Sequence, residues 1–167
     1  MVPVRLPTPE AVASLLSDLI GRRATAKKGT AFAAPAACAI ATYVEASGGV
    51  AFIAFADVAF VAGVGAALAM IPCGVVQESI SAGKPSEVLV ENAYEVLNIM
   101  ASLFNDGTVG EHHVKIKRLT VAPHLPEKLK FLRLPDGRLD LAISLPGYPD
   151  GKLTIVGTNQ TDRKCES

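Results

Sequence analysis

Hydrophobic residues recur at helical spacing near the start of the chain, between two signals that mark the ends of a helix. Thr8 belongs to the residue types that cap helix N-termini, Pro9 suits the first helical position, and Glu10 places a negative charge in the first turn. Gly21 suits the left-handed conformation that ends many helices. The pattern therefore predicts a helix between them, with an apolar face made of Val12, Leu15, Leu16, Leu19 and Ile20.

Strand signals dominate the next part of the chain and return in its last third. Runs at 22–28 and 36–45 are followed by a Ser47-Gly48-Gly49 turn and a strand that starts at Val50. Consecutive strands of this kind predict an early β-meander, in which each strand pairs with the next. Two Pro-Asp-Gly triplets are turn signals that bound later strands, because Pro presets φ and Gly accepts positive φ. The later strands are expected at 113–121, 129–134, 138–145 and 152–156.

The segment 50–76 is almost uninterrupted in its apolar character and contains one charged residue, Asp57. It exceeds the roughly 20 residues that a membrane-spanning helix needs, so a single span is one interpretation. The other is a buried strand followed by a separate helix, with Asp57 as the N-cap of that helix. The Gly48-Gly49 turn and the helix-forming residues of 58–71 favour the second interpretation, with Pro72 and Gly74 ending the helix.

A further helix begins at Lys84-Pro85-Ser86-Glu87 and is expected to continue to Phe104, where Asn105-Asp106-Gly107 ends it. The predicted order is a helix, three strands, two helices and three or four strands, with no internal repeat or linker. This order predicts the α+β fold class, a mainly antiparallel sheet with helices packed on one face. Residues 1–160 are expected to form a single domain and 161–167 a polar tail.

The charge balance limits the classes of partner. The sequence has 16 basic and 16 acidic residues, which argues against nucleic acid or an anionic membrane, because both bind basic surfaces. The cysteines are far apart and the N-terminus lacks the pattern of a secretion signal, so a cytoplasmic location is expected.

His112 and His113 are neighbours on a predicted strand and point to opposite faces, so no metal site is expected. Gly63 and Gly65 lack the third glycine of a dinucleotide loop, and close helix packing is their expected use.

The helix that ends at Phe104 has an unusual polar face. At about 100° per residue Glu91, Glu95, Asn98 and Ser102 cluster on one side, and the opposite half consists of Leu89, Ala93, Val96, Leu97, Met100, Leu103 and Phe104. A solvated face of an amphipathic helix is one interpretation. A functional one is favoured because Glu91 and Glu95 are like charges four residues apart, and Asn98 is a poor helix former. We refer to Glu91, Glu95, Asn98 and Ser102 as the polar stripe.

The residues from Glu91 to Asn98, with Pro123 farther along, resemble the signature of the CheC/CheX/FliY family of chemotaxis phosphatases. That signature places an acid or serine, a Glu and an Asn on one helix face, and the single copy here is most similar to CheX-like members. The resemblance implies a phosphatase that removes the aspartyl phosphate of a CheY-like response-regulator receiver. It implies that Asn98 orients the attacking water, that Glu95 pairs with a lysine of the receiver, and that Glu91 and Ser102 contact it. Mg²⁺ is expected in the receiver, and no cofactor is expected in this chain.

Two other functions stay open on the sequence. A CheX-like domain without catalytic activity could bind a receiver or another signalling protein through the polar stripe. A structural domain could instead form a homodimer through a sheet edge, where unpaired backbone groups are available. Turnover of receiver phosphate distinguishes the phosphatase from both.

Overall fold

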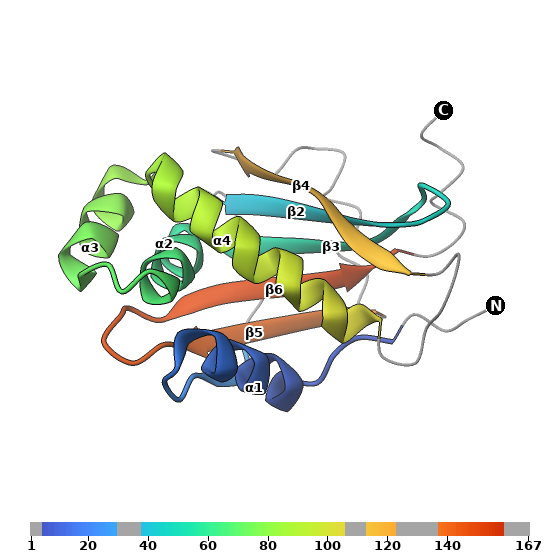
Figure 1. Cartoon of the computed structure of the whole chain (residues 1–167), viewed down its shortest axis with the longest axis horizontal. Coiled ribbons are helices and arrows are strands. Elements are labelled where there is room, and N and C mark those ends of the chain that lie inside the picture. Colours follow the sequence, from blue (N-terminus) through green and yellow to red (C-terminus); the bar gives the residue numbers. More distant parts are fainter. Residues whose placement is uncertain (1–4, 30–37, 106–112, 123–136, 159–167) are drawn as a thin grey trace.

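In the part of the chain that the structure describes, a six-stranded antiparallel sheet forms one layer, and helices pack against one of its faces (Figure 1). The computed structural model describes residues 5–29, 38–105, 113–122 and 137–158. The helices are α1 (Pro9–Ile20), α2 (Val58–Leu68), α3 (Cys73–Ala82), α4 (Glu87–Met100) and the 3-10 helix η1 (Ala101–Phe104). The strands are β1 (Thr25–Lys28), β2 (Cys38–Glu45), β3 (Val50–Asp57), β4 (Val114–Ala122), β5 (Arg138–Ser144) and β6 (Gly151–Gly157). The α+β fold class predicted from the sequence is confirmed.

The order of strands across the sheet is β1-β5-β6-β3-β2-β4, which corrects the predicted β-meander. β2 and β3 form the expected antiparallel hairpin, but β1 pairs with β5 at the opposite edge. The Gly29 N–H donates to the Asp140 carbonyl at 2.9 Å and extends this pairing, and a Cβ on Gly29 would lie 3.0 Å from the Ala142 nitrogen. Long-range packing therefore decides the partner of β1. The strand expected at 129–134 lies outside the described residues.

The apolar segment 50–76 folds as a strand and then helices, as the preferred interpretation expected. Asp57 ends β3 and caps α2, and its Oδ1 accepts hydrogen bonds from the N–H of Phe60 at 2.8 Å and of Lys152 at 3.0 Å. One carboxylate oxygen thus fixes the start of α2 against β6. None of the helices described has both the length and the apolar character needed to cross a bilayer.

Helix α3 begins where the sequence predicts a break. Pro72 occupies its N-cap in an extended conformation, and Gly74 lies in its first turn, so two residues that end a helix elsewhere start one here. α2 ends at Leu68, earlier than predicted, because Met70 adopts a left-handed conformation with φ of 55°. The N–H groups of Met70 and Ile71 then bond to carbonyls in the last turn of α2 and close it.

Helix α4 crosses the helical layer diagonally and packs directly on α2 (Figure 1). Gly65 makes the close approach possible, because a Cβ at this position would lie 2.3 Å from the Leu89 carbonyl oxygen. The Asn92 side chain donates to the Gly65 carbonyl at 3.1 Å. The role in close helix packing predicted for Gly65 is therefore confirmed.

Candidate functional site

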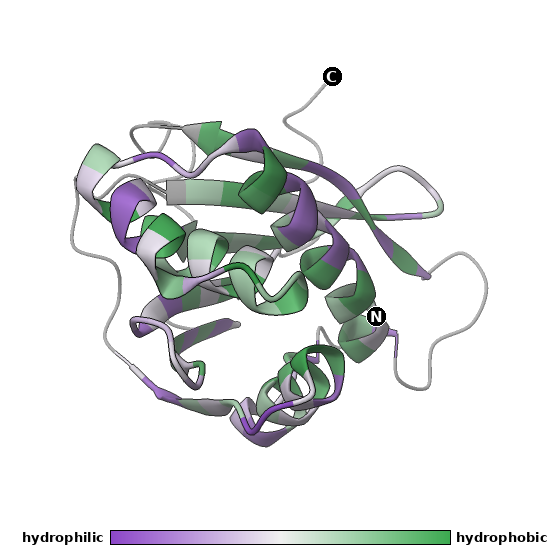
Figure 2. Cartoon of the chain, turned by 60° about the vertical axis from the view of Figure 1, so that its left-hand side comes forward, coloured by the Kyte–Doolittle hydropathy of each residue, from purple (hydrophilic) through white to green (hydrophobic). Residues whose placement is uncertain are grey.

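The polar stripe lies on the solvent side of α4 and η1, and all four of its side chains are exposed. Figure 2 shows hydrophilic positions alternating with hydrophobic ones along this helix. The opposite side of α4 is fully buried and consists of Leu89, Ala93, Val96, Leu97 and Met100. Exposed residues are free to contact a partner, so the structure places Glu91, Glu95 and Asn98 where the sequence predicted them.

Ser102 departs from the predicted geometry. The sequence predicts one helix up to Phe104, but α4 ends at Met100 and Ser102 lies in the 3-10 helix η1. A 3-10 helix has three residues per turn instead of 3.6, so Ser102 does not lie on the straight continuation of the stripe. The change occurs because the Ala101 N–H bonds to the carbonyls of Asn98 and Ile99 rather than continuing the α-helical pattern.

A buried tyrosine from the sheet supports the helix at this point. The Tyr43 hydroxyl donates to the Leu97 carbonyl at 2.7 Å, and the whole Tyr43 side chain is buried. Burial, with a smaller contribution from Tyr94, raises the pKa of Tyr43 above its ordinary value, so the hydroxyl stays protonated and remains a donor. Because Leu97 directly precedes Asn98, this hydrogen bond fixes the backbone beside the proposed water-orienting residue.

Hydrogen bonds of the Asn105 side chain hold the turn after η1. Asn105 Nδ2 donates to the carbonyls of Ala101 at 3.1 Å and Val114 at 2.7 Å, and its Oδ1 accepts the Val114 N–H at 2.7 Å. One amide side chain therefore joins the end of η1 to the start of β4. The stop predicted at Asn105 is confirmed, and its side chain adds a tertiary contact that the sequence did not predict.

Phe104 completes the support beneath the end of the helix. Its ring packs edge-on against Tyr43, with centroids 4.8 Å apart, and stacks on Phe52 at 4.2 Å. Aromatic pairs of this kind add stabilisation beyond the area that they bury. The polar stripe thus sits on a helix whose backbone is anchored near both ends, which is the condition for holding functional side chains in place.

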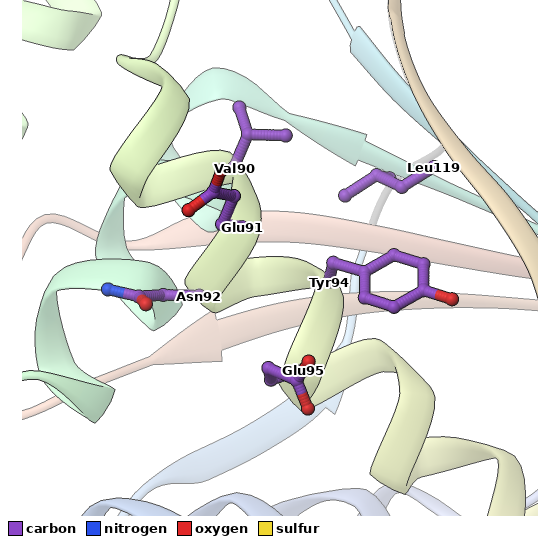
Figure 3. Close-up of a pocket in the computed structure, with 6 residues that line it drawn as sticks. All are labelled: Val90, Glu91, Asn92, Tyr94, Glu95 and Leu119. Atoms are coloured by element: carbon purple, nitrogen blue, oxygen red, sulfur yellow. The ribbon is translucent and has the colours of Figure 1, made fainter.

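A groove of about 500 Å³ lies between α4 and β4, beside the first half of the stripe. Figure 3 shows Tyr94 pointing toward β4 and Asn92 pointing the other way, toward α2, with Glu91 and Glu95 between them. The lining residues are Val90, Glu91, Asn92, Tyr94, Glu95 and Leu119. Two acids thus border a partly apolar surface that is open to a partner.

The charges of the molecule are segregated although its net charge is zero. Over their described lengths, helices α1 to α4 contain six carboxylates and no basic residue, the acids being Glu10, Asp18, Glu78, Glu87, Glu91 and Glu95. The two edge strands contain no acid and carry Lys27, Lys28, Lys115, Lys117 and Arg118. The helices themselves are therefore acidic, while Arg22, Arg23 and Lys84 are exposed in the loops at their ends. The acids of α1 and α4 favour a basic partner through electrostatic complementarity.

Sequence reasoning missed two exposed apolar residues on α4. Val88 is 56% exposed and Ile99 is 42% exposed. They lie three turns apart on the helix, next to the polar stripe, so the helical periodicity contained the signal. Tyr94 and Leu119 were also missed, because only the packing of β4 against α4 brings them together.

Some of the predicted features cannot be placed. Pro123 and His112 lie outside the described residues, and His113 is exposed just before β4. Among the residues that the structure describes, no group of three or more His, Cys, Asp or Glu side chains is arranged to hold a metal ion.

No protein-family model matches the sequence, and no curated protein matches it. Solved structures do match the fold. The FliM middle domain from H. pylori gives a TM-score of 0.60 at 9% identity, over 89% of this chain and 84% of that one. CheX, in a CheX-CheY-BeF3-Mg²⁺ complex from Borrelia burgdorferi, gives 0.57 at 18% identity, over 90% and 94%. A FliG-FliM complex from H. pylori gives 0.53 at 7% identity, over 89% and 86%.

Likeness at these identities establishes the fold alone. It extends over nearly the whole of each chain, so the match includes both the sheet and the helical layer. The resemblance first carried by the residues around Glu95 and Asn98 is thereby supported by an independent comparison. The chain has the fold of the CheC/CheX/FliY family.

Proposed function

We propose that this protein is a CheX-like phosphatase that accelerates the loss of phosphate from the aspartyl group of a CheY-like receiver. The observation that carries the proposal is the exposure of Glu95 and Asn98 on neighbouring turns of a helix whose backbone is anchored. Residues three apart on a helix lie about 5–6 Å apart at Cβ. Both side chains can therefore enter one site on a partner.

Asn98 is the proposed catalytic residue. Its carboxamide has both a donor and an acceptor, so it can hold a water molecule in line with the phosphorus atom of the aspartyl phosphate. Phosphoryl transfer is promoted mainly by positioning and charge stabilisation, and a general base from this chain is not required. The Tyr43 hydrogen bond to Leu97 limits movement of the adjoining backbone and so favours one position of the carboxamide.

Glu95 is proposed to bind a lysine of the receiver and to fix the orientation of the two proteins. Glu91 and Ser102 are proposed to contact the receiver on either side of this pair. Mg²⁺ bound in the receiver neutralises developing negative charge on the phosphoryl group. We propose that the receiver, and not this chain, binds this ion.

The CheX structure supports this proposal because it was solved in a complex with CheY. The FliM structures support a second candidate, since FliM of the same fold was solved in complexes with FliG and with SpeE. In that alternative the chain binds a receiver or another signalling protein without turnover. The exposed Val88 and Ile99 favour some protein partner under either function.

The test is the decay of phosphate on a panel of CheY-like receivers charged with a small phosphodonor and Mg²⁺. The wild type is expected to accelerate the decay for at least one receiver. Asn98→Ala should lose about 100-fold in kcat, the scale expected when a positioned group is removed, and Glu95→Ala should raise KM. Gln77→Ala, an exposed polar residue on α3, is the matched control and should retain wild-type rates. Decay rates unchanged by the wild type for every receiver would overturn the proposal, and binding without acceleration would favour the second candidate.

A further inference from the structure

A second groove lies on the other side of α4, against α1. Its volume is about 460 Å³, and it is lined by Ala11, Ser14, Leu15, Asp18, Leu19, Ile99 and Leu103. Ser14 and Asp18 are exposed on the α1 side, whereas Leu15, Leu19 and Leu103 are partly buried and pack on the core. The groove thus has an apolar floor with one negative charge at its rim.

Ile99 joins this groove to the proposed site. It directly follows Asn98 in the sequence, lines the groove, and is 42% exposed. Single exposed apolar residues are common on protein surfaces and need no explanation alone. Ile99 differs because it stands in a groove and is the sequence neighbour of Asn98, so a partner that reaches Asn98 is close enough to contact this side chain.

The acidic residues of α1 and α4 limit which partner surfaces can bind in this groove. Within the described residues, neither Asp18 nor Glu95 makes an ion pair, and α1 and α4 contain no basic side chain. An apolar floor with the Asp18 carboxylate at its rim is complementary to a surface that presents an aliphatic side chain next to a lysine or arginine. A second acidic surface would be repelled.

We propose that the α1–α4 groove is a second contact region for the receiver, and that it accepts an aliphatic side chain with Asp18 binding a neighbouring basic residue. The proposal rests on the proposed function, since the receiver is its occupant. It adds a specificity surface that the sequence signature does not contain. Receivers that lack the aliphatic and basic pair are bound more weakly, whatever their phosphorylation site.

The experiment measures the Kd of the full chain for CheY-like receivers held in the activated form with beryllofluoride and Mg²⁺. Ile99→Ala is expected to weaken binding about fivefold, equivalent to about 1 kcal/mol. Asp18→Lys is expected to weaken it to a similar extent at about 50 mM salt and much less at about 500 mM, because salt screens exposed charges. Thermal unfolding of each variant verifies that the chain is folded.

Two matched controls lie on α3, away from the groove. Ile80 is 39% exposed, close to Ile99, and Glu78 is an exposed acid comparable to Asp18. Ile80→Ala and Glu78→Lys should change Kd less than twofold. Groove variants that behave like these controls, with a wild type that binds a receiver, overturn the groove assignment and leave the proposed function standing. A wild type that neither binds nor dephosphorylates any receiver overturns both.

Discussion

The two sides of α4 differ in what holds them. The buried side contacts α2 through Gly65, receives the Tyr43 hydrogen bond at Leu97, and contributes Leu89, Val96 and Met100 to the core. The exposed side carries three acids at successive i,i+4 spacing, Glu87, Glu91 and Glu95, and, within the described residues, no ion pair that would offset them. The difference indicates that stability depends on the buried side of this helix, and the proposed function uses the exposed side. Substitutions on the two sides should therefore have separable effects.

The largest effect is expected on the buried side, at Gly65. A Cβ would lie 2.3 Å from the Leu89 carbonyl oxygen, so Gly65→Ala must push α2 and α4 apart. We expect a loss of about 3 kcal/mol in the free energy of unfolding, the upper range for overpacking. Urea denaturation followed by circular dichroism measures it.

Gly63→Ala is the matched control on the same helix. A Cβ there would meet only the Leu145 Cδ1 atom, at an ordinary contact distance of 3.5 Å. Because Ala is a better helix former than Gly, this variant should gain up to about 1 kcal/mol. Equal losses at both positions would show that the close approach of α2 and α4 is not what Gly65 provides.

Tyr43→Phe tests the hydrogen bond beneath Asn98. The substitution keeps the ring contact with Phe104 but leaves the Leu97 carbonyl without its buried donor, at a cost of about 1–3 kcal/mol. Tyr94→Phe is the control, because no hydrogen bond involves the Tyr94 hydroxyl among the described residues. It should change the free energy of unfolding by less than about 0.5 kcal/mol. If both variants lose the same stability, the Leu97 contact is unimportant.

Asp57 caps α2, the helix on which α4 packs, and makes the free energy of unfolding depend on pH. Burial raises the pKa of Asp57 above 3.8, although N–H donors from Lys152 and Phe60 partly oppose the shift. A raised pKa means that the folded protein binds more protons, so stability falls as pH rises from about 4 through the shifted value. Asp57→Asn keeps the Oδ1 acceptor and removes the titration. Wild-type stability, relative to this variant, should decline between pH 4 and 7 in urea denaturation, and a relative increase would contradict the shift.

The smallest effect is expected on the exposed side. Glu91→Gln removes the repulsion from both Glu87 and Glu95 and should stabilise the protein by about 0.2–0.5 kcal/mol for each pair, while weakening binding to the receiver. Glu87→Gln is a control on the same helix that relieves only the repulsion from Glu91. It also loses the favourable interaction of a negative charge with the first turn, about 0.3–1 kcal/mol, so it should lose stability slightly. Thermal denaturation resolves the opposite signs. A destabilised Glu91→Gln protein would mean that this carboxylate supports the fold.

Much of the local structure could be predicted from the sequence because its signals are local. Thr8, Gly21 and Asp57 occupy the caps expected of them, since a cap depends on the next few residues. The position of β1 could not be predicted, because its pairing with β5 joins segments far apart in the chain. Likewise α3 was missed, since Pro72 and Gly74 break helices in most contexts but here occupy its cap and first turn.

The candidate site likewise has some features that could be predicted from the sequence and others that could not. Helical periodicity correctly placed Glu91, Glu95 and Asn98 on the exposed side of α4. It could not reveal the end of α4 at Met100, because that end coincides with a hydrogen bond from Tyr43, 54 residues away. The grooves were equally inaccessible, since one needs β4 and the other α1 beside α4.

The most direct test of the division between the two sides of α4 is the single-turnover rate of receiver dephosphorylation by Asn98→Ala at saturating protein. Saturation removes any difference in binding, and an exposed Asn98 should leave the free energy of unfolding within about 0.5 kcal/mol of wild type. The rate is expected to fall about 100-fold, close to the spontaneous decay of the receiver. A folded Asn98→Ala protein that retains the wild-type rate would contradict the assignment of function to the exposed side.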